Sequence, residues 1–524
     1  MNRTLAITAA PSAADAVRLP AGSELFIGLW LTVLAVPAMG AVPNPTVSGP
    51  IPVNVAAGDP SHDYPQLSTQ ADLTGSGYVE EEFFFQGAAN EYDVVTAPLA
   101  DAAVRSSGHP YKTRLIVRRP VSSKEFNGVV LVEWLNVTSG YNLDALWLLQ
   151  QDHLMREGYA YVGVSVQRVG VQGAPANPAQ PSSLTRWSPT RYGALDVTAG
   201  GRFVLANSGG VDASDALSFD IMAQAGQAIK NPGAVDPLGG LRAEHFNGLR
   251  TVIASGVSQS EAFLVSYYNS VHAADPVYDG FFLYLGIGRG AYGAFALPLR
   301  TDLPTKVFKV NTENDVLLLG EYLIRQSDST TLRTWEVAGA SHVGFDPRMR
   351  RTALLIRDNL PIANVNVCAA PALSRIPTFH VLNAALEHLV RWVRLDAPPP
   401  TAPRIELATP SPIPVPPPPP APFDRGVATA VRDADGNALG GIRLPQHAVP
   451  TATNTGVNSG PGFCFLFGSH LPFTAERLAE LYPTHETYVF KTVAATLDNL
   501  KDGFIVKPEA VQNVRDAAHS DIGK

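Results

Sequence analysis

The sequence predicts an α/β fold in which a mostly parallel central sheet is covered by helices on both faces. Residues 129–134 and 161–166 form short, almost wholly apolar runs, which are typical of strands buried on both sides. Helix-compatible segments alternate with such runs along the chain, as in doubly wound sheets. Hydrophobic residues make up 45% of the 524-residue chain and charged residues 16%, so enough apolar material is present for a large core.

The predicted elements follow one another regularly after residue 75. Strands are expected at residues 81–85, 113–117, 129–134, 161–166, 251–255, 280–284, 306–310 and 332–337. Helices are expected at residues 143–156, 216–229, 379–393, 478–482 and 492–500. Asp435 and Gly436 stand between two short apolar runs, a pattern typical of a β-hairpin.

Shifts in composition divide the chain. Residues 416–420 are consecutive prolines, which predict a stiff surface spacer, with a docking ligand as the alternative. The expected parts are a signal peptide at 1–40, an irregular arm at 41–75, an α/β core at 76–397 with a lid-like insertion at 170–214, a proline-rich spacer at 398–423, and a hairpin and helices at 424–524 that pack on the core.

The first 40 residues have the features of an export signal. Arg3 and Arg18 precede an apolar run at residues 25–36, and small residues suited to cleavage follow at 38–40. We therefore expect a secreted or periplasmic protein. The alternative is a protein anchored in the membrane by the same apolar run, although the run is short for a spanning helix.

Charge and cysteine content limit the possible partners. The formal net charge is −8 and no long Lys/Arg run is present, so we do not expect nucleic acid as a partner. A stable membrane partner is not expected either, and the oligomeric state stays open. Cys368 and Cys464 are the only cysteines. In an oxidising compartment they would form one disulfide around the proline-rich segment; the alternative is two buried free thiols.

The strongest chemical signal is a Gly-x-Ser-x-Ser motif at residues 256–260. It follows the apolar run at 251–255 and precedes a helix-compatible segment. A sharp strand-to-helix turn of this kind exposes a serine hydroxyl and needs small flanking residues. Gly256 and Ser260 meet that need, although glycine is commoner than serine at the second position. Ser258 is the predicted nucleophile, and a chance surface loop is the alternative.

An acid and a histidine follow Ser258 in the chain order expected for such a nucleophile. The strand at 306–310 leads into Glu313 and Asp315, and the strand at 332–337 leads into His342. We expect His342 to act as the base and Asp315 to orient it, with Glu313 as the competing acid.

Two backbone donors are expected to bind the oxyanion that forms during acyl transfer. One is the N–H of Gln259, which follows the nucleophile. The other is expected in the loop after the strand at 129–134, from Asn136 or from Leu135. No His/Asp cluster has metal-ligand spacing, so no metal is expected.

Several segments together resemble a known family, the mostly bacterial, esterase-like α/β-hydrolases described as "alpha/beta hydrolase domain". The matching segments are residues 132–137, 161–171, 256–260, 337–342 and 435–443. The likeness runs from about residue 75 to residue 505. It implies an α/β-hydrolase fold and carboxylic-ester hydrolysis without a cofactor, and it implies no particular substrate.

The expected activity is hydrolysis of a small or medium-sized ester by a serine esterase through an acyl-enzyme. An amidase, peptidase or acyltransferase with the same catalytic residues is the enzyme alternative, and a catalytically silent binding scaffold is the other. Aromatic side chains between residues 170 and 214, namely Trp187, Tyr192 and Phe203, belong either to a lid over an apolar substrate group or to ordinary packing.

Overall fold

The computed structural model describes residues 42–94, 99–174, 181–201, 215–241, 248, 250–291, 297–408 and 428–524. The expected signal peptide, Phe203 and most of the proline-rich segment lie outside these residues. Among the described helices, none combines the length and apolarity needed to cross a lipid bilayer.

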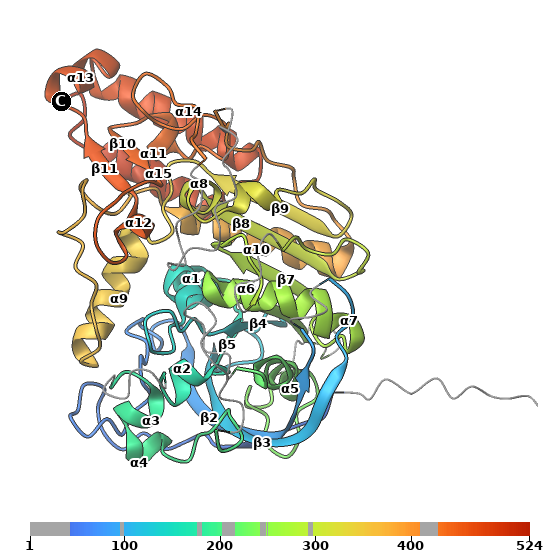
Figure 1. The fold of residues 1–524 in the computed structure, drawn as a ribbon. Helices are drawn as coiled ribbons and strands as arrows, with labels where there is room; N and C mark the ends of the chain where they lie inside the picture. Colours follow the sequence, from blue (N-terminus) through green and yellow to red (C-terminus); the bar gives the residue numbers. More distant parts are fainter. Residues whose placement is uncertain are drawn as a thin grey trace, which may run out of the picture. The chain divides into compact units, whose positions relative to one another are not determined.

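The described strands form a nine-stranded sheet in the order β1-β2-β3-β5-β4-β6-β7-β8-β9 (Figure 1). The strands from β5 to β9 pair in parallel, whereas β1, β2 and β3 join the edge next to β5 in antiparallel pairs. Their bounds are β1 Thr46–Ser48, β2 Tyr78–Tyr92, β3 Val104–Pro120, β4 Val129–Trp134, β5 Ala160–Val164, β6 Thr251–Val257, β7 Gly280–Tyr284, β8 Lys306–Thr312 and β9 Leu332–Val337.

Strand β4 shows why the central strands are apolar along their whole length. Val130 and Val132 join one core cluster, with helices α5 and α6, while Val129 and Leu131 join another, with α1 and α10. Alternate side chains of a strand point to opposite faces, so a sheet covered on both faces requires apolar residues at every position. The predicted fold class is confirmed.

The helices pack around this sheet and beyond its last strand (Figure 1). Around the sheet lie α1 Ala145–Arg156, α2 Arg168–Val171, α3 Leu184–Trp187, α4 Pro189–Tyr192, α5 Ser218–Lys230, α6 Gln259–Ser266, α7 His272–Ala274, α8 Glu313–Leu317, α9 Phe345–Arg357 and α10 Thr378–Leu395. The C-terminal part contains α11 Pro445–Ala448, β10 Ala452–Thr455, α12 Cys464–Phe467, β11 Ser469–Pro472, α13 Ala475–Leu481, α14 His485–Lys501 and α15 Lys507–His519.

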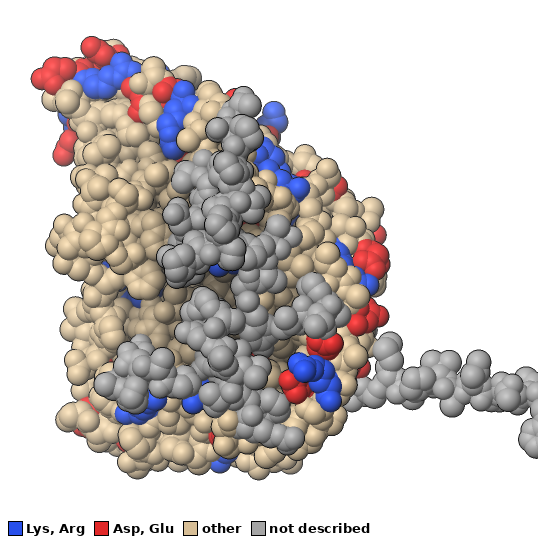
Figure 2. Space-filling model, viewed as in Figure 1, with Lys and Arg blue, Asp and Glu red and all other residues tan. Residues whose placement is uncertain are grey.

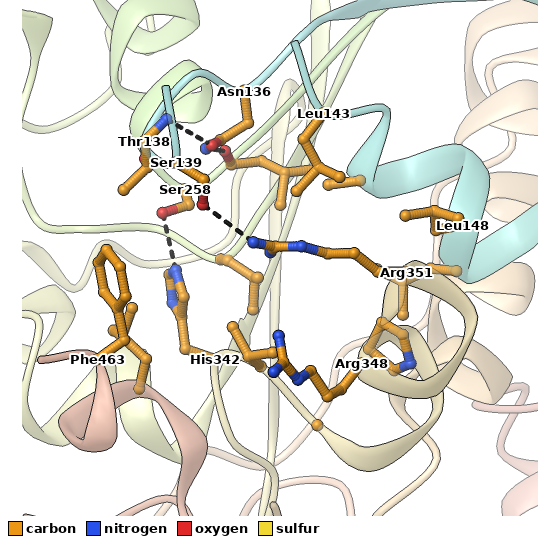
Figure 3. A pocket seen from close by; sticks show the side chains of 18 of the residues that line it. Asn136, Thr138, Ser139, Leu143, Leu148, Ser258, His342, Arg348, Arg351 and Phe463 are labelled. Atoms are coloured by element: carbon orange, nitrogen blue, oxygen red, sulfur yellow. Dashed lines mark hydrogen bonds between the residues drawn. The ribbon is translucent and has the colours of Figure 1, made fainter. Parts of the chain in front are cut away.

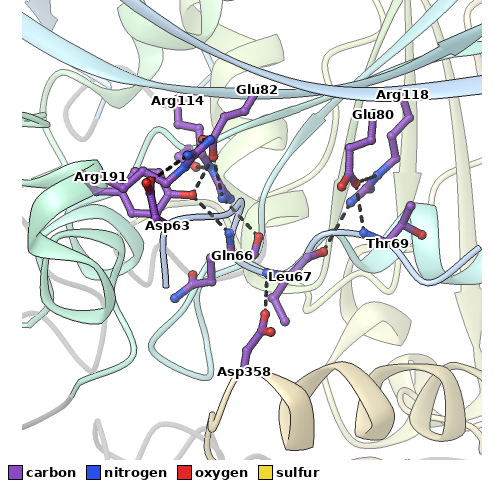
Figure 4. Close-up of polar contacts among 12 residues, drawn as sticks. Asp63, Gln66, Leu67, Thr69, Glu80, Glu82, Arg114, Arg118, Arg191 and Asp358 are labelled. Atoms are coloured by element: carbon purple, nitrogen blue, oxygen red, sulfur yellow. Dashed lines mark hydrogen bonds and ion pairs between the residues drawn. The ribbon is translucent and has the colours of Figure 1, made fainter. Parts of the chain in front are cut away.

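Hydrogen bonds to charged side chains fix the N-terminal arm to the sheet, and the Thr69 N–H of the arm donates to Glu80 of β2 at 3.0 Å (Figure 4). Arg118 of β3 bonds Glu80 of β2 at 2.7 Å and Asp144, just before α1, at 2.6 Å. Farther along the arm, the backbone N–H of Leu67 donates to Asp358 at the end of α9 at 2.7 Å. These contacts hold the arm, β2, β3 and the C-terminal end of α9 together.

The segment expected to form a lid is mainly packed against this arm where it is described. Trp187 stacks on His62 with ring centroids 4.1 Å apart, and the Tyr192 hydroxyl donates to Glu82 at 2.7 Å. Of the two roles expected for these aromatic side chains, a lid or ordinary packing, Trp187 and Tyr192 have the packing role in the structure.

The C-terminal part packs back onto the sheet. A bridge joins Arg432 and Ala438 around the predicted turn, and Ile442 bridges to Val337 of β9. Phe504 and Ile505, which lie between α14 and α15, enter the same core cluster as α10. On the face drawn in Figure 2, the described acidic and basic side chains are interspersed and the basic ones form no continuous patch.

One buried acid on β4 makes stability depend on pH. Glu133 is fully buried and accepts hydrogen bonds from the Leu146 N–H at 3.0 Å and from the Tyr161 hydroxyl at 2.6 Å. Burial raises the pKa of Glu133 to about 8. Between its unfolded pKa of about 4.3 and this value, the folded chain keeps a proton that the unfolded chain loses. Protonated Glu133 therefore stabilises the fold at acidic pH, and this stabilisation is lost as the pH rises to 8.

Replacing Glu133 with glutamine is expected to remove this dependence, because an amide carries no titrating proton. The variant should gain thermal stability relative to the natural chain as the pH rises from 5 to 8.5. Melting temperatures of both proteins, measured across that range in one buffer series, test this expectation. Parallel curves would show that Glu133 is not the group responsible.

Candidate active site

Ser258 lies in the tight turn between β6 and α6. Its backbone has φ 61° and ψ −118°, a conformation that costs a residue with a Cβ about 1–3 kcal/mol. The turn brings chain segments very close: a Cβ on Gly256 would stand 2.8 Å from the Ser260 carbonyl oxygen. Glycine is therefore needed at position 256, as the motif predicted.

Ser260 takes the place where glycine is commoner because its hydroxyl bonds back to the turn. The Ser260 Oγ accepts from the Val257 N–H at 2.9 Å and donates to the Val257 carbonyl at 3.0 Å. The side chain is fully buried, and these bonds satisfy its hydroxyl while bracing the turn.

His342 connects Ser258 to Asp315. The Nδ1 of His342 lies 2.6 Å from Asp315 Oδ1. Its Nε2 lies 2.7 Å from Ser258 Oγ, and Figure 3 shows this second contact. A carboxylate only accepts, so Nδ1 carries the proton and Nε2 of the neutral ring accepts from the serine hydroxyl. His342 and Asp315 are buried whereas Ser258 is partly exposed. Solvent therefore reaches this hydrogen-bonded series mainly at the serine.

Asp315 is held in place by the start of α8. Its Oδ2 accepts from the Thr312 N–H at 2.6 Å and from the Thr312 hydroxyl at 2.8 Å, while the Thr312 hydroxyl caps the Asp315 N–H. This reciprocal capping box fixes the carboxylate and leaves Oδ1 for His342.

Glu313, the competing acid, points elsewhere. Its carboxylate accepts from Arg432 at 2.7 Å and from the backbone N–H groups of Gly339 and Gly456 at 2.8 and 3.1 Å. It links α8 to the loop before His342 and to the C-terminal part. The structure therefore brings Asp315, and not Glu313, to the histidine.

One of the two expected oxyanion donors is free within the described part of the chain, and the other is not. The Gln259 N–H makes no hydrogen bond with the described residues and stands beside Ser258 at the start of α6. The N–H of Asn136, however, is bonded to Leu143 O at 3.0 Å, and that of Leu135 to Val164 O at 3.2 Å. Both candidates for the second donor, the N–H groups of Asn136 and Leu135, are therefore already hydrogen-bonded.

Asn136 instead supports the turn with its side chain. Its Nδ2 donates to Val257 O at 2.9 Å, and its Oδ1 accepts from the Thr138 N–H at 3.0 Å. The Val137 N–H has only a 3.5 Å contact, to the side chain of Gln259, and is the better second candidate in this loop. The sequence did not reveal this because the bridge between Asn136 and Leu143 is a feature of the folded loop.

Ser258 and His342 open into a cavity of about 100 Å³. One apolar wall of the cavity contains Leu143, just before α1, and Leu148 of α1. Another contains Phe463 and Phe467. None of the described residues between 170 and 214 lines it.

Arg348 and Arg351 also line this cavity and were not predicted (Figure 3). They stand one turn apart on α9, a helix that the sequence reading missed. The available signal was Pro347 near the helix start, followed by arginines at a spacing of three, which places them on one helix face.

A disulfide supports the wall that carries Phe463 and Phe467. Cys368 and Cys464 are bonded in the structure. The same segment reaches the loop after His342, because the Val343 N–H donates to Leu466 O at 2.9 Å.

Replacing Cys464 with serine is expected to lower the free energy of unfolding by about 4–5 kcal/mol, because the cross-link closes a long loop in the unfolded chain. The bonded cysteines are 96 positions apart. Denaturant unfolding with and without reductant measures the effect. The natural protein should respond to reductant and the variant should not; equal unfolding midpoints for the oxidised and reduced natural protein would contradict the expectation.

The fold and site together define a class. Ser258, Asp315 and His342 follow the ends of the parallel strands β6, β8 and β9, and occur in the chain order of an α/β-hydrolase. Within the described ranges, no group of three or more His, Cys, Asp or Glu side chains is placed to hold a metal ion. The chain belongs to the family described as "Alpha/beta hydrolase domain", whose model matches residues 47–515.

Three solved structures that are similar to the chain are 11–13% identical to it. No curated protein sequence matches it. A putative acetyl xylan esterase from Bacteroides fragilis is 13% identical with a TM-score of 0.28, and the match covers 57% of this chain and 70% of that one. A putative dienelactone hydrolase from Klebsiella pneumoniae is 12% identical with a TM-score of 0.26, covering 53% and 98%. Acetyl xylan esterase 1 from Thermoanaerobacterium is 11% identical with a TM-score of 0.26, covering 56% and 86%.

Proposed function

We propose that this protein is a serine carboxylic-ester hydrolase that works through an acyl-enzyme on a small or medium-sized ester. The observation that carries the proposal is the hydrogen-bonded series from Ser258 through His342 to Asp315, which opens into a cavity. A serine hydroxyl needs an adjacent oriented base to become a nucleophile, and this geometry supplies one.

In the proposed mechanism, Ser258 Oγ attacks the ester carbonyl as its proton passes to His342 Nε2. Asp315 stabilises the imidazolium, and the Gln259 N–H donates to the oxyanion. The tetrahedral intermediate then expels the alkoxide, which takes the proton from His342 and leaves as the alcohol. A water molecule, deprotonated by His342, attacks the acyl-enzyme in the same way and releases the acid.

A fluorophosphonate probe combined with a substrate panel tests this proposal. Labelling of the peptide that contains Ser258, together with hydrolysis of short 4-nitrophenyl esters, is the expected result. Matched anilides and an added alcohol acceptor distinguish amide hydrolysis and acyl transfer, the enzyme alternatives. Absence of both labelling and turnover would favour a silent binding scaffold.

We also propose that the protein is exported to an oxidising compartment. The disulfide supports this proposal, because such bonds persist outside the reducing cytosol. Cell fractionation and the N-terminal sequence of the mature protein test it: cleavage after residue 40 is expected, and an intact N-terminus in the membrane fraction would indicate the anchored alternative.

A further inference from the structure

The cavity next to Ser258 is positively charged within an acidic protein. Its lining contains Arg348 and Arg351 and no Asp or Glu, whereas the chain as a whole has a formal charge of −8. Burying a cation is costly unless an anion or several hydrogen bonds compensate it. The two arginines therefore need an explanation beyond the general composition of the chain.

Other arginines show how this protein usually compensates such charges. Arg118 and Arg191, both buried, pair with carboxylates at 2.7 Å or less. Arg350, which stands between the two cavity arginines on α9, pairs with Asp152 at 2.5 Å. Within the described part of the chain, neither Arg348 nor Arg351 has an ion pair with an Asp or Glu.

The cavity arginines are held instead by neutral oxygens. Arg351 Nη2 donates to Ser139 Oγ at 3.0 Å and to the Tyr141 hydroxyl at 2.7 Å, and its buried Nε has no partner. Arg348 is 5% exposed, and its Nη2 donates to the Ala363 carbonyl at 2.5 Å. These bonds orient both guanidinium groups toward the cavity without neutralising them (Figure 3).

The energetic consequence is visible at Arg348. Burial, and then the neighbouring charge of Arg351, lower the pKa of Arg348 below its ordinary value. The attraction of a bound anion would offset both unfavourable effects. Guanidinium groups match the planar geometry of a carboxylate, which accepts two parallel hydrogen bonds.

We infer that Arg348 and Arg351 bind a carboxylate of the substrate, so that the preferred ester is a short one carrying a free carboxylate group. This inference rests on the proposed esterase function and specifies its substrate class. A cavity of about 100 Å³, lined by Leu148 and Phe463 among others, suits a short substrate group next to Ser258.

Matched pairs of esters test the inference. Monoethyl glutarate and ethyl pentanoate differ by a carboxylate in place of a methyl group on the acyl side, and acetoxyacetate and ethyl acetate differ in the same way on the alcohol side. The natural protein should show kcat/KM at least about tenfold higher for the charged member of one pair, and that pair identifies the side on which the carboxylate lies. Preference for the neutral member of both pairs would overturn the inference.

Variants assign the preference to the arginines. Arg351→Gln and Arg348→Gln should each reduce the charged-to-neutral ratio of kcat/KM by about tenfold or more, mainly through KM. Arg350→Gln is the matched control, since it removes the same charge from the same helix, and its ratio should stay at the natural value. If Arg350→Gln lowers the charged-to-neutral ratio of kcat/KM as much as the other two variants, the preference is due to the general positive charge of α9, and the specific carboxylate site is wrong. Arg351 is only partly buried, so its variant remains informative if Arg348→Gln fails to fold.

Calorimetry with glutarate separates this inference from the proposed function. The natural protein should bind glutarate, and Arg351→Gln should lose about tenfold or more in affinity, whether or not any ester is hydrolysed. Hydrolysis of the neutral esters without glutarate binding would overturn the carboxylate site and leave the esterase standing. Glutarate binding without any ester hydrolysis would overturn the esterase and leave the site.

Discussion

Replacing Ser258 with alanine is expected to lower kcat for an activated aryl ester by about 10⁶-fold, the scale on which serine hydrolases lose rate without their nucleophile. The reason is that the alternative nucleophile, water, has no fixed position against His342. Stopped assays over hours, with product quantified by chromatography, cover that range. His342→Ala should fall equally far, because the serine and the base act as a unit.

A glycine at the same position supplies the control for folding. Ser258 has φ 61°, so Ser258→Gly relieves a strain that Ser258→Ala keeps. We expect both variants to be inactive and the glycine variant to be more stable than the alanine variant by about 1 kcal/mol. Substantial activity in either variant would assign the reaction to another group, and an unstable glycine variant would contradict the strain at this turn.

The order of elements and the nucleophile could be predicted from sequence because both depend on local patterns. Strands covered on both faces must be apolar at every position, as β4 shows. The motif at residues 256–260 carries its own steric requirement at Gly256. His342 and a nearby acid followed because parallel strands bring their carboxyl ends to one edge of the sheet.

What the sequence could not predict depends on contacts between distant segments. Glu313 and Asp315 both follow the strand end within three residues, and only the partners of Glu313, Arg432 and Gly456, show which carboxylate is engaged elsewhere. The position of Asn136 after a strand predicted an oxyanion donor, but the loop folds back to Leu143, and this contact is not visible in the sequence. The sequence pattern did not predict helix α9, because four of its residues are arginines and Leu354 and Leu355 are its only buried apolar side chains, yet it carries both cavity arginines.

Replacing Asp315 with asparagine should reduce kcat by about 10⁴-fold, because an amide at this position favours the wrong histidine tautomer. Asparagine can donate a hydrogen bond to Nδ1, which would place the ring proton on Nε2 and leave no acceptor for the Ser258 hydroxyl. The loss should appear in kcat far more than in KM, since the carboxylate lies behind the histidine and does not line the cavity.

Glu313→Gln is the matched comparison, since it neutralises a fully buried carboxylate two positions away. It should keep most of the activity and lose stability instead, by about 2 kcal/mol, because the charge-assisted bond from Arg432 is weakened.

Both kcat and the free energy of unfolding should be measured on the two variants. We expect a loss of kcat for Asp315→Asn and a loss of stability for Glu313→Gln. A larger catalytic loss at Glu313 would mean that the carboxylates exchange roles in the working enzyme. Arg432→Gln would then decide the matter, because releasing Glu313 from Arg432 should raise activity only if Glu313 is the acid that orients His342.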